Sequence, residues 1–293
     1  MRATQSNARR KLALYGAIER LIPRRRIWQL GRFLYQGARR DLINHPEVNG
    51  EYGLLDKMLP WWRAAEGDLA FLDVGANHGD WSVALLRRLG SDRARTFLWA
   101  FEPAPAQASE AESRLIQASS GACVALERVA VSDNSGWASF DVTGEKTGNS
   151  GIAGPEARGH LIDVPLIRLD EYPLNSFNGP IRLIKIDTEG NDFNVIKGAK
   201  KLFDAARIEI CQFEYNWRWM DFGYNLRDVF NWIEGRNYKL GALTSEGVEI
   251  HQAWHPELER FFETNFVLIR EDIIERTGAN VMAFDHANVA VPL

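Results

Sequence analysis

The chain has 293 residues, a net charge of −4 and 45% hydrophobic residues, values that are typical of a water-soluble globular protein. The length allows one large α/β domain with an appendage, or two small domains. No apolar run approaches the roughly 18 residues that are needed to cross a bilayer, which argues against a membrane-spanning protein.

The N-terminal segment is strongly basic. Residues 1–40 contain eleven Arg or Lys and one acid, Glu19, a charge of about +10, so the remaining 253 residues carry about −14. Apolar and basic residues alternate there as in an amphipathic helix that is broken near Pro23. A secretory signal is not expected, because no uninterrupted apolar segment follows the charges. We therefore interpret residues 1–67 as a basic helical extension, followed by one domain at 68–293.

Three interpretations of this basic extension stay open. The first is a helical cap packed on the core. The second is a helix that lies on an anionic membrane surface or holds an acidic lipid-linked substrate, and the third is a mitochondrial transit peptide. The second interpretation corresponds to peripheral contact with the inner face of a membrane.

After residue 68, short apolar runs alternate with helical patterns. A connector with a short helix is expected at 42–66, and it leads into a strand at 69–74, a turn at 75–79 and a helix from Trp81 to Leu89. Next come a strand at 96–101, a helix at 105–118, a strand at 123–131 and a β-hairpin of 136–142 with 160–169. The last part is expected to form a strand at 182–187, a helix at 190–203, a strand at 207–215, a helix at 226–234 and a closing antiparallel pair of 238–243 with 266–270. This order predicts an α/β fold with a mostly parallel seven-stranded sheet and helices on both faces.

The chain has two cysteines, Cys123 and Cys211, and both fall in predicted strands. They are expected to be buried small hydrophobic residues rather than a disulfide framework. A reducing compartment, the cytoplasm, is therefore the expected location.

Each predicted core strand ends in an acid or a short polar group. In open α/β sheets, ligands bind outside the carboxyl ends of the strands, so these residues are candidates for a binding site. They are Asp73 with the Gly75–Gly79 turn, Glu102, Ser132 with Asp133 and Asn134, Asp187 with Thr188 and Glu189, and Glu214.

The glycine turn is Gly-x-x-x-Gly and is bracketed by Asp73 and Asp80, which suits a ligand with a positive end. S-adenosylmethionine carries an ammonium and a sulfonium and no phosphate. Asp73 is predicted to organise the turn and the amino-acid part of this ligand. Glu102 is predicted to accept hydrogen bonds from the ribose hydroxyls, and Asp133 from the adenine amino group.

At these residues the sequence resembles the FkbM family of methyltransferases. The resemblance covers about residues 68–215, and its motifs are Phe71–Ser82, Phe101–Pro103, Val129–Asp133, Ile184–Gly190 and Asn191–Ala199, with an acid at Glu214. It implies a Rossmann-like class I methyltransferase fold that transfers a methyl group from S-adenosylmethionine, often to hydroxyls of sugars, glycolipids or natural products. The residues expected to bind the cofactor are Asp73, Gly75, Ala76, Asn77, Gly79, Trp81, Ser82, Glu102, Pro103, Ser132, Asp133 and Asp187.

Methyl transfer to an alcohol needs a base or a metal ion to remove or weaken the hydroxyl proton. In one mechanism, Asp187 or Glu214 is the general base. In the other, Asp187, Glu189 or Asp192, and Glu214 hold a divalent cation such as Mg²⁺ through oxygen ligands. Lys185 is expected on the same side of its strand as Asp187.

Two further features of the sequence are candidate parts of the site. His78 lies in the glycine turn, from which it could reach the acceptor. The glycine-rich segment Gly144–Gly159, with Asn149 and Ser150, is a candidate lid over the cofactor.

The main hypothesis is an O-methyltransferase with a small-molecule or glycan acceptor, no nucleic-acid partner, and the possibility of a homo-oligomer. A methyltransferase of nucleic acid or protein is the principal alternative, because the N-terminus is basic. A non-enzymatic relic and a nicotinamide-dependent dehydrogenase are the others.

Overall fold

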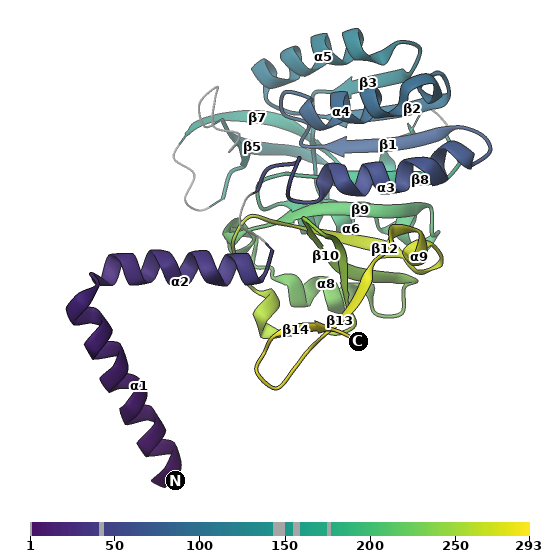
Figure 1. Ribbon diagram of the computed structural model, residues 1–293. Helices are drawn as coiled ribbons and strands as arrows, with labels where there is room; N and C mark the ends of the chain where they lie inside the picture. The colour runs from purple at the N-terminus through teal and green to yellow at the C-terminus, as the bar shows by residue number, and fades with distance from the viewer. Residues whose placement is uncertain (1, 41–43, 143–149, 155–158, 175–176) are drawn as a thin grey trace. The chain divides into compact units, whose positions relative to one another are not determined.

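The computed structural model describes residues 2–40, 44–142, 150–154, 159–174 and 177–293 (Figure 1). Residues 1–44 and 45–293 form two separate compact units. The first unit contains the helices α1 (Arg2–Leu21) and α2 (Arg24–Ala38), which are separated at Pro23 as predicted. None of the helices in the described residues is long and apolar enough to cross a membrane.

The second unit is built on a large sheet that contains ten strands among the described residues. From one edge to the other, they are β14 (Ala290–Pro292), β13 (Asn280–Phe284), β11 (Gly247–His251), β10 (Tyr238–Thr244), β12 (Thr264–Arg270), β9 (Ile208–Tyr215), β8 (Ile181–Ile186), β1 (Leu69–Val74), β2 (Thr96–Phe101) and β3 (Cys123–Glu127).

The strand order of this sheet reverses between β1 and β8. The chain runs outward from β1 to β2 and β3 and later returns to β8 and β9, and all five strands are parallel. The antiparallel pair of β10 with β12 closes this half of the sheet, as predicted. The α/β fold class is confirmed, but β11, β13 and β14 extend the sheet beyond the seven strands that were predicted.

Helices cover both faces of this sheet (Figure 1). On one face, apolar side chains of α3 (Glu51–Ala64), α4 (Asp80–Leu89) and α5 (Pro105–Ser119) form one core cluster with Phe71 and Leu183. On the other face, α6 (Asp192–Gly198), α7 (Lys200–Asp204) and α8 (Leu226–Ile233) form a second cluster with Leu72 and Ile184. Alternate residues of β1 and β8 thus face opposite cores, as the pleat of a strand requires.

The prediction of a single strand at 123–131 is wrong. This segment divides into β3 in the large sheet and β4 (Ala130–Val131) in a separate four-stranded sheet. That second sheet has the order β4, β7 (His160–Ile167), β5 (Gly136–Val142) and β6 (Gly151–Ile152), and it contains the predicted hairpin of β5 with β7. The charged pair Glu127 and Arg128 interrupts the apolar residues where β3 ends, but two charged residues at a strand boundary do not by themselves show a change of sheet.

The predicted helix at 190–203 is also divided, into α6 and α7. A Cβ atom added to Gly198 at the end of α6 would lie 2.0 Å from the carbonyl oxygen of Ser132. The helix therefore approaches the backbone after β4 too closely to continue past that point with an ordinary side chain.

The two cysteines differ in exposure. Cys211 is buried in β9 as expected, but the expectation is wrong for Cys123, which is exposed. Cys123 begins β3, which is the edge strand of the large sheet. An edge strand has a neighbour on one side only, so its first residue is less covered.

The segment before β1 belongs to the α/β unit. The sequence places the start of the domain at residue 68, whereas the structure groups residues 45–67 with the sheet. Leu55, Met58 and Trp62 of α3 are almost fully buried in the core cluster on the α4 face.

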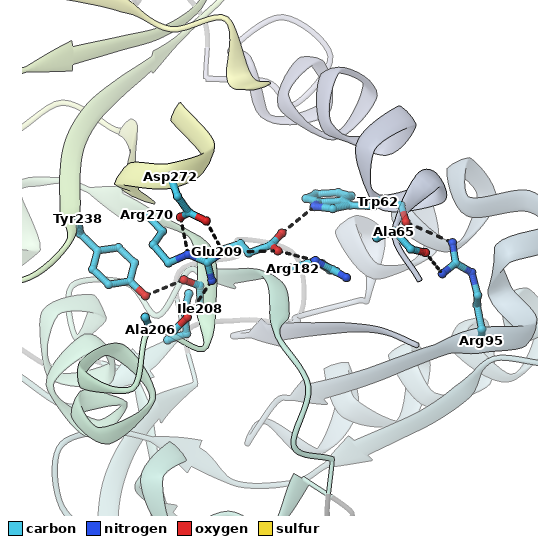
Figure 2. A network of polar contacts seen from close by, with 10 residues as sticks. All are labelled: Trp62, Ala65, Arg95, Arg182, Ala206, Ile208, Glu209, Tyr238, Arg270 and Asp272. Atoms are coloured by element: carbon cyan, nitrogen blue, oxygen red, sulfur yellow. Dashed lines mark hydrogen bonds and ion pairs between the residues drawn. The ribbon is translucent and has the colours of Figure 1, made fainter. Parts of the chain in front are cut away.

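A buried polar network surrounds Glu209 of β9 (Figure 2). Its carboxylate accepts a hydrogen bond from Trp62 Nε1 at 3.2 Å, forms an ion pair with Arg182 of β8, and lies 3.9 Å from the guanidinium of Arg270 in β12. Glu209 and Arg182 are both less than 10% exposed. The network therefore joins α3 to β8, β9 and β12. It lies near the first residues of β8 and β9.

The substitution Glu209→Gln is expected to lower the free energy of unfolding by about 3–5 kcal/mol, because it leaves the buried guanidinium of Arg182 without its counter-charge. Denaturant unfolding of the two proteins measures the difference. Glu112→Gln is the control, since Glu112 pairs with Arg128 at the surface, where both side chains are about half exposed. It should change the stability by less than about 0.5 kcal/mol. Equal losses for the two variants would contradict a structural role for the buried network.

Candidate functional site

The turn after β1 lies directly against the end of β8. Gly75 has φ +79°, and a Cβ atom added to it would lie 1.8 Å from the carbonyl oxygen of Asp187. The backbone N–H of Asp187 in turn donates a hydrogen bond to the carbonyl of Val74 at 2.9 Å. Only glycine fits this position, both for its backbone conformation and for the space available. The turn is thereby fixed at the reversal of strand order, where open α/β sheets bind ligands.

The carboxylate of Glu102 is held by the backbone of the two neighbouring turns. It accepts hydrogen bonds from the N–H groups of Asn77 and Ala104, both at 2.8 Å. Glu102 is 6% exposed, and burial raises the pKa of its carboxyl, although the two N–H groups act in the opposite direction. The carboxylate is therefore fixed in one orientation at the end of β2.

A cavity opens beside this turn. Its walls come from the ends of β1, β2 and β8 and from the small sheet. The lining residues are Val74, Gly75, Asn77, Phe101, Glu102, Pro103, Gln107, Val129, Ala130, Val131, Phe140, Ser150, Ile152, Asp187, Thr188, Glu189 and Asn191. Three of these described residues are acids and none is Lys or Arg, so the cavity suits a ligand with a positive charge.

The cavity has an apolar part and an acidic part. Phe140 of β5 and Ile152 of β6 pair across the small sheet and line the cavity together with Val129–Val131. Glu102, Asp187 and Glu189 come from the strand ends of the large sheet. The site can therefore receive a ligand that combines a flat apolar group with hydroxyls and a cationic centre.

Lys185 lies next to the acidic part and compensates for part of its negative charge. Its ammonium is 3.1 Å from Asp187 Oδ2, which agrees with the expected alternation along β8. Burial acts to lower the pKa of Lys185, but Asp187, Asp73 and Glu51 outweigh it and raise the pKa above its usual value. The raised pKa favours the protonated form of Lys185, which has no lone pair with which to act as a general base.

Asp73 supports the turn from below and does not line the cavity. It is fully buried, and its Oδ2 atom accepts a hydrogen bond from Ser82 Oγ of α4 at 2.6 Å. Burial raises the pKa of Asp73, while Lys185 and Ser82 act against that rise. The role predicted for Asp73, in organising the turn and binding the amino-acid part of the cofactor, stays a prediction.

Four acids cluster around the ends of β8 and β9. Glu189 has φ +56°, an uncommon backbone conformation for a residue other than glycine, and pairs with Arg218 at 3.4 Å. Burial and the neighbouring Asp187 raise the pKa of Glu189 to about 8. Burial also raises the pKa of Asp192 to about 7, and it raises the pKa of Glu214 with help from Asp187 and Glu189.

The candidate metal ligands have protein partners in this structure. Asp187 pairs with Lys185, Glu189 pairs with Arg218, and Glu214 accepts a hydrogen bond from Asn216 Nδ2 at 2.8 Å. Asp192 accepts hydrogen bonds from the backbone N–H groups of Thr188 and Gly190. Within the described residues, no three His, Cys, Asp or Glu side chains are arranged to hold a metal ion. The described residues therefore do not form a preformed set of ligands for the divalent cation of the second mechanism.

The structure brings some of the predicted site residues to the cavity and leaves others outside its lining. Those that line it are Gly75, Asn77, Glu102, Pro103, Asp187 and Glu189. Those outside the lining are Asp73, Ala76, His78, Gly79, Trp81, Ser82, Ser132, Asp133, Lys185 and Glu214. Asn149 of the candidate lid lies outside the described residues, whereas Ser150 lines the cavity.

Several of the residues outside the lining have clear structural partners. The imidazole of His78 is 2.9 Å from Glu110 of α5. The carboxylate of Asp133, which was predicted to bind the adenine, accepts a hydrogen bond from Lys197 at 2.7 Å. Trp81 is buried in the core cluster on the α4 face. The roles predicted for these residues in cofactor binding and catalysis stay predictions.

Sequence reasoning missed the apolar wall of the cavity. Phe140 and Ile152 belong to a sheet that forms between distant segments, so no local pattern indicates that they reach the site. It also missed Glu51 at the start of α3, whose carboxylate accepts hydrogen bonds from Gln212 at 2.8 Å and Asn265 at 3.3 Å. Gln107, which lines the cavity, was missed as well. A local signal could have found it, because it lies in the first turn of α5 just after a strand end, and such helix starts commonly face a ligand.

Comparison with known protein families gives a match over more than half of the chain. The sequence pattern of the Methyltransferase FkbM domain matches residues 73–240, a stretch that begins at Asp73 and includes Glu102, Asp187 and Glu214. No curated protein sequence gave a significant match.

Solved structures of several methyltransferases are similar to this chain at a low level. Methyltransferase FkbM from Methylobacillus flagellatus is 14% identical with a TM-score of 0.44, over 72% of this chain and 47% of that protein. The O-methyltransferase from Bacillus cereus, in complex with S-adenosylhomocysteine, is 17% identical with a TM-score of 0.41, over 82% and 90%. The O-methyltransferase TomG from Streptomyces achromogenes, in complex with S-adenosylmethionine, is 15% identical with a TM-score of 0.40, over 80% and 86%. This chain spans about half the length of the first of these proteins, and likeness at this level carries no argument about activity.

Substitution Gly75→Ala is expected to destabilise the protein by more than about 3 kcal/mol, because the added methyl group collides with the carbonyl of Asp187 in addition to straining the backbone. Gly67→Ala is the matched control. Gly67 has φ +75°, and no atom lies within 4 Å of its added Cβ, so only the strain of about 1 kcal/mol remains. Denaturant unfolding should separate the two variants, and a similar loss in both would show that the close approach is unimportant.

Proposed function

We propose that this chain, which belongs to the FkbM family of methyltransferases, transfers a methyl group from S-adenosylmethionine to a hydroxyl oxygen of a sugar, a glycolipid or a natural product. The matched residues 73–240 make up more than half of the 293-residue chain. The observation that carries the proposal is that the glycine turn, Glu102 and two further acids line a single cavity.

The charge of the cavity suits S-adenosylmethionine. Gly75 lets the turn lie against the end of β8 beside the cavity, and no cation among the described lining residues repels a sulfonium or an ammonium group. Glu102 would accept hydrogen bonds from the ribose hydroxyls, since its carboxylate is oriented by the backbone before any ligand arrives. The apolar wall of Val129–Val131, Phe140 and Ile152 would pack on the adenine.

S-adenosylmethionine supplies the methyl group as an electrophile on sulfur. The protein has to hold the acceptor hydroxyl in line with it and to accept the hydroxyl proton. Of the two sequence-derived base candidates, Asp187 lines the cavity and Glu214 does not. Glu189 also lines it, and its pKa of about 8 makes it the stronger proton acceptor at alkaline pH. Both acids have a cationic partner, Asp187 in Lys185 at 3.1 Å and Glu189 in Arg218 at the longer distance of 3.4 Å. We therefore propose Glu189, the less closely paired of the two, as the general base.

Glu102→Gln is expected to weaken binding of S-adenosylhomocysteine by about tenfold or more, because it removes a charge-assisted acceptor. Isothermal titration calorimetry measures the affinity. Glu127→Gln is a suitable control, since Glu127 ends the next strand, accepts a hydrogen bond from the Tyr172 hydroxyl, and does not line the cavity. An unchanged affinity for Glu102→Gln would remove the basis for placing the cofactor here.

The rate of methyl transfer is expected to rise with pH and to level off above about pH 8. Glu189 accepts a proton only in its ionised form, and the ionised fraction grows as the pH passes the pKa of about 8. Measurement of kcat/KM against pH reports this group in the free enzyme. Glu189→Gln should lower the rate at pH 8 by about a hundredfold or more and abolish the pH dependence.

The control for this pH profile is Glu263→Gln, because Glu263 is exposed and contributes little to the pKa of Glu189. This variant should keep the wild-type profile. If Glu189→Gln also keeps the rise with pH, another group is the base. Loss of activity with a chelator in the wild type, restored by Mg²⁺, would favour the alternative mechanism with a divalent cation.

The acceptor itself is tested by mass spectrometry. The protein is incubated with S-adenosylmethionine and a panel of sugars, lipid-linked sugars and hydroxylated natural products, and each product is examined for the addition of one CH₂ group. Methylation of a nucleic acid or a protein in place of these acceptors would contradict the proposed acceptor class, while the family assignment would stand.

A further inference from the structure

Helix α2 has an apolar stripe and a polar stripe on opposite sides, and none of its residues is buried. The apolar stripe consists of Ile27, Leu30, Leu34 and Ala38, and the polar stripe consists of Arg25, Gln29, Arg32 and Gln36. Within each stripe the residues recur at intervals of three or four, and at about 3.6 residues per turn the two stripes face in opposite directions. An exposed apolar stripe of this kind is typical of a helix that binds a partner or an interface.

Two aromatic residues lie at the boundary between the apolar stripe and the polar stripe. Trp28, which is 70% exposed, and Tyr35 are seven residues apart, so they lie above one another along this boundary. Tryptophan and tyrosine are enriched where an apolar phase meets water, because each ring has an apolar body and a polar atom. The arrangement favours an interface between lipid and water over a fully buried contact.

The charge of the segment decides between possible partners. The first 40 residues carry about +10, so two copies of this segment would repel one another if their helices paired. A nucleic acid would neutralise this charge but would offer the apolar stripe nothing to pack on. An anionic lipid surface satisfies both, with the acyl boundary for the stripe and the headgroups for the arginines.

Helix α1 repeats this chemistry. Leu12, Leu14 and Leu21 are each more than 60% exposed, and Arg9, Arg10 and Lys11 precede or accompany them. The helix is also not apolar enough to cross a membrane. Both helices therefore combine exposed apolar side chains with positive charge, as helices that lie in the plane of a membrane surface do.

We propose that residues 9–38 bind the surface of an anionic phospholipid bilayer. The apolar stripe of α2 enters the boundary between headgroups and acyl chains, Trp28 and Tyr35 lie at its edge, and the arginines contact the phosphates. This surface is separate from the methyl-transfer site, so the proposal does not depend on the acceptor.

Vesicle flotation with the full-length protein tests this surface. One set of vesicles contains phosphatidylcholine alone, and the other contains equal parts of phosphatidylcholine and phosphatidylglycerol. The protein should float with the anionic vesicles and stay behind with the neutral ones, and high salt should weaken the binding.

Variants separate the apolar contribution from the charge. The double substitution Trp28→Ala with Leu34→Ala should weaken binding to the anionic vesicles by about tenfold or more. Trp137→Ala is the matched control, because Trp137 on β5 is 73% exposed and lies outside the segment, and it should bind like the wild type. Arg25→Glu with Arg26→Glu should weaken binding to a similar extent.

Several results would overturn the proposal. They are equal flotation with both kinds of vesicle, no flotation with either, and full binding by the Trp28 and Leu34 double variant. Light scattering that shows the wild type as a dimer and this variant as a monomer would assign the stripe to a second copy of the chain. RNA binding that competes with the vesicles and is unaffected by the double variant would assign the segment to nucleic acid.

Discussion

The contact between the Gly75 turn and the carbonyl of Asp187 is the constraint on which the site depends. It joins the ends of β1 and β8, the two strands between which the order of the sheet reverses. Because this contact fixes the turn, the N–H of Asn77 reaches Glu102, and Asp187 and Glu189 emerge on the other side of the same cavity. A bulkier residue at position 75 would separate the two halves of the site.

The sheet carries buried charge at both ends of its central strands, and the two ends are stabilised differently. Where β8 and β9 begin, Glu209 and Arg182 neutralise one another and join α3 to the sheet. Where they end, acids outnumber bases, and Lys185 compensates for only part of the excess. Burial without a compensating cation raises the pKa of a carboxyl. The end of the sheet with more acids than bases is therefore the end suited to proton transfer.

The two units of the chain differ in the sign of the charge that they offer to a ligand. The α/β unit surrounds its cavity with acids, which attract a cationic methyl donor. The N-terminal unit has a net positive charge, about +10 over residues 1–40, on helices with exposed apolar side chains. The net charge of −4 hides this division, so average composition is a poor guide to the partners of this protein.

The sequence by itself determined the succession of strands and helices, the break at Pro23, the glycine turn and the acids at the strand ends, because these features depend on residues close together in the chain. Only the tertiary structure decided that the apolar run 123–131 divides between two sheets, that Phe140 and Ile152 line the cavity, and that Asp133 pairs with Lys197. Each of these outcomes depends on which distant segments meet when the sheets assemble. The periodicity of a strand shows which residues share a face, but it does not show what that face will contact.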